Sequence, residues 1–79
     1  MSSYIRKISI GTQPKGNSMH YFLGQKVSDK YTVSSIIEVP TEVGRRHDIY
    51  VRDGSGVEMK WKEVNEYLPK ILEYNLEFT

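Results

Sequence analysis

The chain has 79 residues, of which 38% are hydrophobic and 27% are charged, as is typical of one folded domain and not of a disordered segment. It contains no cysteine, so disulfides, thiolate zinc sites and thiol nucleophiles are excluded. Eleven Lys and Arg residues against ten Asp and Glu residues give a formal charge of +1, which argues against a strongly basic nucleic-acid-binding protein.

Most of the chain alternates apolar and polar residues with a period of two, which predicts β-strands. The first predicted strand covers residues 4–10. The segment 11–18 follows, and its glycines, proline and asparagine are typical of an irregular loop. Residues 19–27 fit either a short strand or one helical turn that is capped by Asn17 or Ser18.

The segment 31–39 is rich in β-branched residues and predicts another strand. Val33 and Ile37 share one face of this strand, whereas Ile36 falls on the other face. Either both faces are partly covered, or a β-bulge near residues 34–35 shifts the alternation.

A β-hairpin is the clearest local feature of the sequence. Residues 47–52 and 57–62 alternate as strands, and the Asp-Gly-Ser-Gly segment 53–56 between them supplies the glycines that tight hairpin turns need. Trp61 continues the apolar alternation of Val57 and Met59, so we expect its side chain in the core.

Residues 61–68 change to helical spacing and predict one short helix, which Pro69 ends. The apolar residues at i, i+3 and i+7 in this segment are Trp61, Val64 and Leu68. Strict alternation returns in residues 71–78 and predicts the last strand.

Together these elements describe a mainly β domain that spans residues 1–79. We expect a small antiparallel sheet or an SH3-like barrel with the short helix before the last strand, and an open antiparallel sheet packed on a helix is the alternative. The core is small and has no covalent crosslinks, and the apolar residues on both faces of 31–39 need cover. We therefore expect a homo-oligomer.

The two ends of the chain carry opposite charge. Basic residues dominate 1–30 and acidic residues dominate 63–79. If the first and last strands pair, Arg6 and Lys7 will lie near Glu73 and Glu77. The sequence has neither the apolar run of a signal peptide nor one of the roughly 20 residues that span a membrane, so we expect a cytoplasmic protein.

Motifs for catalysis or metal binding are absent from the sequence. Its two histidines, His20 and His47, lack the spacing of metal ligands. There is no nucleophile-elbow motif, and a chain this short rarely encloses a pocket that excludes water. We expect a non-enzymatic protein without a metal or another cofactor.

Two basic segments are candidates for binding an anion. In the loop 11–18, Lys15 supplies a cation, while Asn17 and Ser18 can present backbone N–H groups at the start of a helical turn. Because the Gly residues of this loop are not followed by Lys-Ser/Thr, it is not a Walker A loop. The alternative is an ordinary connecting loop.

The second segment contains Arg45 and Arg46, whose side chains match phosphate oxygens in a bidentate fork. Strand alternation places Arg46, Tyr50 and Arg52 on one outward face, and Tyr50 or Tyr21 offers a surface for stacking a base. The alternative is a solvated loop end, where the arginines pair with nearby acids such as Glu42 or Asp48.

The order of several features resembles the small accessory proteins of large tailed bacteriophages. The residues that carry the resemblance are 8–11 (Ile-Ser-Ile-Gly), Met19, Tyr21, 24–25, 49–51, 61–62 and 73–74. The resemblance implies a small, oligomeric anti-defence or host-takeover protein that acts in the host cytoplasm. Some proteins of this kind sequester cyclic nucleotide signals, and others bind and block host factors.

We therefore predict a small binding protein that sequesters an anionic, nucleotide-like ligand. The alternatives are an inhibitor that binds a host protein through an exposed strand edge, or an SH3-like nucleic-acid-binding module. The net charge of +1 counts against the last of these, because binding to a phosphate backbone needs a strongly basic surface.

Overall fold

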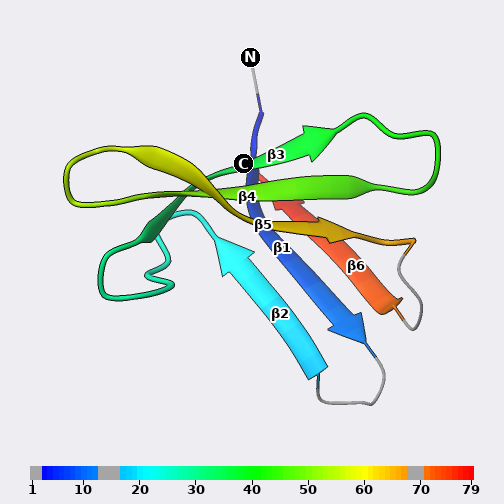
Figure 1. The fold of residues 1–79 in the computed structure, drawn as a ribbon. Helices are drawn as coiled ribbons and strands as arrows, with labels where there is room; N and C mark the ends of the chain where they lie inside the picture. Colours follow the sequence, from blue (N-terminus) through cyan, green and yellow to red (C-terminus); the bar gives the residue numbers. More distant parts are fainter. Residues whose placement is uncertain (1–2, 13–16, 68–70) are drawn as a thin grey trace.

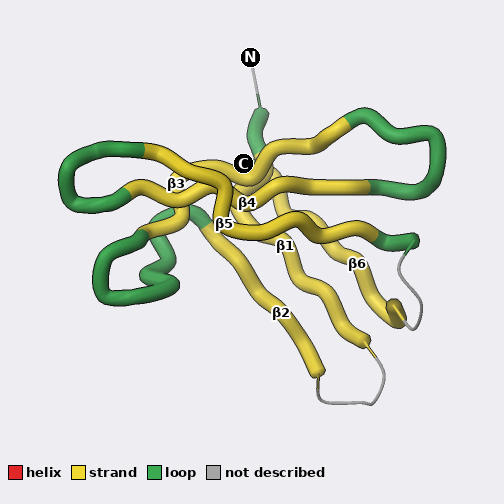
Figure 2. Tube along the Cα trace, viewed as in Figure 1, coloured by secondary structure: helices red, strands yellow, loops and turns green. Residues whose placement is uncertain are grey.

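The computed structural model describes residues 3–12, 17–67 and 71–79. These residues form six β-strands, and none of them lies in a helix that could cross a membrane. The strands are β1 (Ile5–Thr12), β2 (Asn17–Phe22), β3 (Thr32–Val39), β4 (Arg46–Arg52), β5 (Glu58–Asn65) and β6 (Ile71–Phe78). The expected mainly β fold is confirmed (Figure 2).

The strands form two three-stranded antiparallel sheets. Sheet A has the order β2-β1-β6 and sheet B has the order β3-β4-β5. The strands of sheet A run obliquely across those of sheet B (Figure 1). The nine buried apolar residues come from both sheets, so the core lies between them. They are Ile5, Ile8, Ile10, Val33, Ile36, Ile49, Val51, Val64 and Tyr74.

The backbone connects the two sheets on one side. After β2 the chain turns at Gly24 and runs beside β3, where Gly24 N–H donates to Val33 C=O (3.0 Å) and Val33 N–H donates to Gln25 C=O (2.8 Å). Such a shared corner is typical of small barrels whose strands switch sheets. Within the described residues, no backbone pairing joins β5 to β6.

The predicted helix at 61–68 is wrong, because residues 58–65 form strand β5. The register of β4 and β5 shifts between Ile49, which pairs with Lys62, and Tyr50, which pairs with Lys60, so Trp61 is an extra residue in β5. This bulge adds one residue to β5, so Trp61 and Val64 face the same side at a spacing of i, i+3. The spacing that suggested a helix therefore comes from a β-bulge, and Leu68 lies outside the described residues.

The bulge expected near Ser34 and Ser35 is confirmed. The register of β3 and β4 shifts between Val33 and Ser35, which turns Ile36 into the core and leaves Ile37 48% exposed. Here too, two buried residues of one strand are separated by three positions.

The other local expectations have mixed outcomes. The 53–56 turn is confirmed, since Asp53 N–H donates to Val57 C=O (3.1 Å). The helical turn that was one reading of residues 19–27 is absent, because β2 occupies residues 17–22. The pairing of opposite charges between the first and last strands is confirmed for Glu77, which contacts Arg6 at 2.7 Å and Lys7 at 3.7 Å.

Candidate functional site

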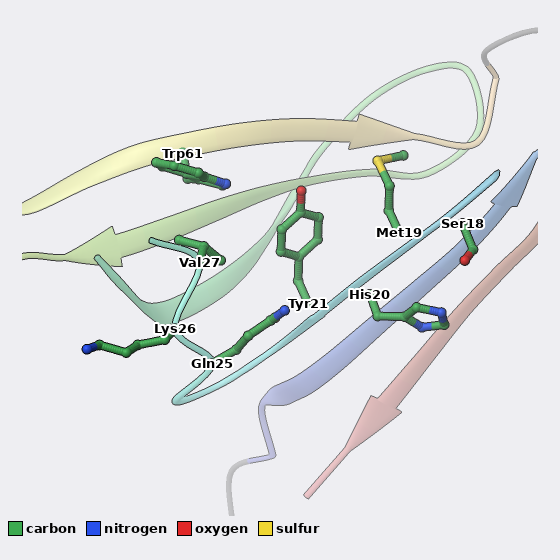
Figure 3. A pocket seen from close by; sticks show the side chains of 8 residues that line it. All are labelled: Ser18, Met19, His20, Tyr21, Gln25, Lys26, Val27 and Trp61. Carbon is green, nitrogen blue, oxygen red and sulfur yellow. The ribbon is translucent and has the colours of Figure 1, made fainter. Parts of the chain in front are cut away.

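An open cleft of about 380 Å³ lies between β2 and β5, beside the segment that follows β2 (Figure 3). Its lining residues come from β2, from the segment that follows it and from β5: Ser18, Met19, His20, Tyr21, Gln25, Lys26, Val27 and Trp61. The lining includes one lysine and one histidine but no carboxylate. An anionic or neutral ligand therefore meets no repelling acid in the cleft.

Strand alternation explains why apolar side chains face this cleft. Met19 and Tyr21 pair with the buried residues Ile10 and Ile8, so they lie on the inner face of sheet A. The bulge in β5 turns Trp61 toward them from sheet B. Trp61 is 38% exposed and lies outside the buried core where the sequence placed it.

Aromatic rings form the wall of the cleft. Trp61 packs against Tyr31, with ring centroids 5.8 Å apart and an interplanar angle of 47°. The Tyr21 ring stands in the cleft with its hydroxyl pointing toward β5, between Trp61 and Met19 (Figure 3). Such surfaces suit a flat ring, because base stacking on an aromatic side chain contributes about 1–3 kcal/mol.

Polar groups are placed around these rings. The Gln25 Oε1 atom accepts a hydrogen bond from Phe22 N–H (3.0 Å), which fixes the side-chain amide at the cleft. The imidazole of His20 points away from the cleft, toward the outer face of sheet A (Figure 3), where its Nδ1 lies 3.2 Å from Ser9 Oγ. Ser18 is on the same outer face as His20, two residues away along β2.

Three lysines are the unpaired cations of the described residues. Among the residues described, Lys26, Lys30 and Lys62 have no acidic group within ion-pair distance, whereas every other described lysine and arginine has one. Lys26 lines the cleft, Lys62 follows Trp61 and Lys30 precedes Tyr31. Each of these lysines therefore either lines the cleft or is the sequence neighbour of Trp61 or of Tyr31, the ring packed against it.

The arginine site expected from the sequence has a different character. Arg46, Tyr50 and Arg52 share the outer face of sheet B, as alternation predicted. Their charges are already paired: Arg46 contacts Glu63 (2.9 Å) and Asp48 (3.4 Å), and Arg52 contacts Glu58 (3.8 Å). The alternative reading of an arginine paired with Asp48 describes this arrangement.

Two further acid–base contacts complete this outer network. Lys60 lies 2.8 Å from Glu63 and 3.5 Å from Asp48. The hydrogen bond from Lys60 lowers the pKa of the Glu63 carboxyl, and Arg46 adds to this effect. A phosphate on this face would have to compete with three carboxylates for the same cations, and the face carries no excess positive charge.

Arg45 lies apart from Arg46 and connects Glu66 with Tyr74. Its guanidinium donates to Glu66 Oε2 (3.1 Å) and to the Tyr74 carbonyl oxygen (3.0 Å), and it covers the Tyr74 ring at 4.9 Å from the centroid. The hydrogen bond to Glu66 raises the pKa of Arg45. Arg45 thus ties sheet B to β6 and is held by protein groups.

The other predicted site residues are divided among separate places. Tyr21 faces the cleft, Tyr50 lies on the outer face of sheet B, and Asn17 begins β2. Lys15 lies outside the described residues. Because β2 replaces the helical turn, Asn17 and Ser18 do not begin a helix, and the anion site expected at its N-terminus is not formed.

The sequence analysis missed Gln25, Lys26 and Val27 and assigned Trp61 to the core. These residues meet only because the chain turns at Gly24 and a bulge redirects Trp61, and neither event has a strong local signal. The Trp61–Val64 spacing was the available clue, since it breaks the strand period within an otherwise alternating segment.

His47 is a buried polar residue outside the cleft. Its Nδ1 atom lies 2.7 Å from the Tyr74 hydroxyl, which donates to Val64 C=O (3.2 Å), and its Nε2 atom has no hydrogen-bond partner. Burial lowers the pKa of His47 and raises the pKa of Tyr74 to about 12. No group of acids and histidines that could hold a metal ion occurs among the described residues.

Comparisons with protein families, curated proteins and solved structures find no match to this chain.

Proposed function

We propose that this protein is a non-enzymatic binding protein that captures a planar, anionic, nucleotide-like ligand in the cleft between β2 and β5. The observation that carries the proposal is an accessible Trp61 side chain in a cleft whose lining contains the unpaired Lys26 and no carboxylate, with the unpaired Lys62 next to Trp61 in sequence. An aromatic surface binds the base, and unneutralised ammonium groups bind phosphate.

The cleft residues have separable roles in this proposal. Trp61 and Tyr21 both contact the base: either they stack on its two faces, or one stacks on a face and the other contacts an edge. The Gln25 amide hydrogen-bonds to the base edge. Lys26 and Lys62 hold the phosphate at the mouth of the cleft. A volume of about 380 Å³ is at the small end of ligand pockets, which suits one nucleotide unit in contact with solvent.

Capture without turnover agrees with the resemblance to bacteriophage accessory proteins. In that setting the protein acts in the host cytoplasm as an anti-defence sponge that withdraws a signalling nucleotide. The cleft offers stacking surfaces and cations, and we assign none of its side chains a role as a nucleophile or a general base.

Trp61 is the single tryptophan of the chain, so its fluorescence reports directly on the cleft. Titration with a panel of linear and cyclic mono- and dinucleotides should quench or shift this emission in a saturable way. A charge-assisted contact contributes about 1.5–3 kcal/mol, so Lys26→Gln should weaken binding roughly tenfold or more.

Lys7→Gln is the matched control, because Lys7 lies on the outer face of sheet A beside Glu77 and should leave the affinity unchanged. Arg46→Gln separates the cleft from the arginine face: a loss of binding in this variant with none in Lys26→Gln would place the ligand on sheet B instead. If no nucleotide binds, the proposal fails and the inhibitor of a host protein becomes the preferred function.

A further inference from the structure

We propose that two copies of the chain associate through the free edge of β5, antiparallel and centred on Met59. The strand lies at the edge of sheet B, and residues 58–63 are all exposed. Met59 is 45% exposed although it pairs with the fully buried Val51 and faces the inner side of the sheet. An exposed edge with apolar residues invites pairing with another strand.

The charged residues of β5 distinguish it from the other strands at the sheet edges. The sequence of β2 contains no lysine, arginine or carboxylate, β3 contains one carboxylate, and β6 contains two glutamates and no cation. Two copies of the same strand can place opposite charges next to each other only if that strand contains both a cation and a carboxylate. In β5, Glu58 and Lys60 provide both signs two residues apart on the outer face.

The backbone hydrogen-bonding pattern of β5 also favours pairing through Glu58 and Lys60. Asp53 N–H donates to Val57 C=O, so the backbone groups of Val57 face β4. Because backbone direction alternates along an antiparallel strand, those of Met59 face β4 as well. The N–H and C=O groups of Glu58 and Lys60 therefore face the free edge, where a second strand can pair with them.

These constraints select one register. Antiparallel pairing about Met59 places Glu58 opposite Lys60 of the second copy twice, and it joins residues whose backbone groups both face the edge. Pairing centred on Glu58 or on Lys60 places like charges opposite each other. If the pairing is centred between two residues, each residue whose backbone groups face the free edge lies opposite a residue whose backbone groups face β4, so the two cannot hydrogen-bond to each other.

This association does not depend on ligand binding, but it reaches the cleft. Antiparallel pairing about Met59 brings Val57 of the second copy next to Trp61, which is the aromatic wall of the cleft. The second copy would then cover part of the exposed apolar surface formed by Val57 and Met59. Its formation is measured without any nucleotide, so its failure and the failure of the proposed function are distinguishable.

Sedimentation equilibrium should give a dimer at micromolar concentrations for the unmodified chain. In Lys60→Glu, a glutamate lies opposite a glutamate in both pairs, so association should weaken roughly tenfold or more. Adding Glu58→Lys to Lys60→Glu restores opposite charges and should restore the dimer. A monomer at all concentrations, or equal association of the unmodified chain and Lys60→Glu, would overturn the proposal.

A crosslink tests the register even where the charge variants fold poorly. Facing residues of a pair that is not hydrogen-bonded have Cα atoms about 4.5 Å apart, which a disulfide can span. The chain has no cysteine of its own, so Met59→Cys should give a covalent dimer on mild oxidation. Ile37→Cys, on the edge strand β3 and similarly exposed (48%), should remain monomeric on a non-reducing gel. The reverse pattern would contradict pairing through β5.

Discussion

His47 and Tyr74 join the two sheets at the side where no backbone pairing does so among the described residues. The Tyr74 hydroxyl from β6 donates to Val64 C=O on β5, and it lies 2.7 Å from His47 Nδ1 on β4. Since the hydroxyl proton is directed at Val64, the imidazole donates its Nδ1 proton to Tyr74. The neutral imidazole therefore suits this position, and its Nε2 atom carries the unused lone pair.

Protonation of His47 should destabilise the fold. Burial lowers the pKa of His47 below its ordinary value of 6.5, although Glu38 at 4.0 Å and Asp48 oppose the shift while Arg45 adds to it. The unfolded chain then binds more protons than the folded chain as the pH falls below about 6.5, so stability is retained above that pH and lost below it. The loss has an upper limit of about 1.4 kcal/mol per pH unit.

Thermal unfolding followed across this range checks the His47 prediction. His47→Gln keeps a hydrogen-bond donor, in its side-chain amide, but cannot titrate. Between neutral and mildly acidic pH, its melting temperature should therefore fall less than that of the unmodified chain. His20→Gln removes the other imidazole of the chain, on the outer face of sheet A, and should keep the steeper fall. Parallel profiles for the unmodified chain and His47→Gln would show that His47 does not cause the fall.

Bulges recur among the elements, and they explain what the sequence pattern predicted poorly. In β1 and β3 the register shifts between two inward-facing residues that are three positions apart: Ile5 and Ile8 in β1, and Val33 and Ile36 in β3. In β5 it shifts between Lys60 and Lys62, and the extra residue Trp61 lies three positions before the buried Val64. An extra residue in a strand produces the i, i+3 spacing of a helix. The flanking β-branched residues indicated the bulge in β3, whereas Pro69 and Glu66 made the same spacing in β5 resemble a helix.

The β3–β4 hairpin depends on Gly44. Its φ of +64° lies in the left-handed region, and an added Cβ would stand 2.9 Å from Glu66 Cγ, which Arg45 holds in place. Gly44→Ala should therefore lower the free energy of unfolding by about 1–2 kcal/mol, as measured by denaturant titration. Gly54→Ala is the control, because a Cβ there meets nothing within 4 Å. Equal midpoints for the two variants would refute a special role for Gly44.

The molecule as a whole is two three-stranded sheets, which are joined by backbone hydrogen bonds beside Gly24 and by the Tyr74 side chain of β6. Alternation along the chain predicted β1, β3, β4, β6 and the first half of β5, because these strands have one buried face, but it left β2 open and assigned the end of β5 to a helix. The cleft was not predictable in this way, since it depends on the angle between the sheets and on the bulge that turns Trp61 toward Tyr21. The ion pairs of Arg46 and Arg52 likewise join residues from neighbouring strands.

Strand β6 should be indispensable to this arrangement. It covers one side of β1, and it supplies the buried Tyr74 together with the half-buried Leu76. A fully buried apolar side chain contributes about 1.5–3 kcal/mol, and a domain of this size has a total stability of about 4–12 kcal/mol. Losing β6 also exposes the backbone edge of β1, and it removes the Tyr74 contacts with sheet B.

A chain that ends at Tyr67 should therefore fail to fold, and its circular dichroism spectrum should lack strand signal and a cooperative thermal transition. The matched control removes only residues 78–79. It loses the exposed Phe78 side chain with its pairing to Ile5, and the hydrogen bond from Thr79 N–H to Tyr4 C=O (3.0 Å), so it should unfold cooperatively at a slightly lower temperature. If the chain ending at Tyr67 keeps a cooperative transition, sheet B must be stable without β6, and the contacts of Arg45 and His47 with Tyr74 would have little weight in the fold.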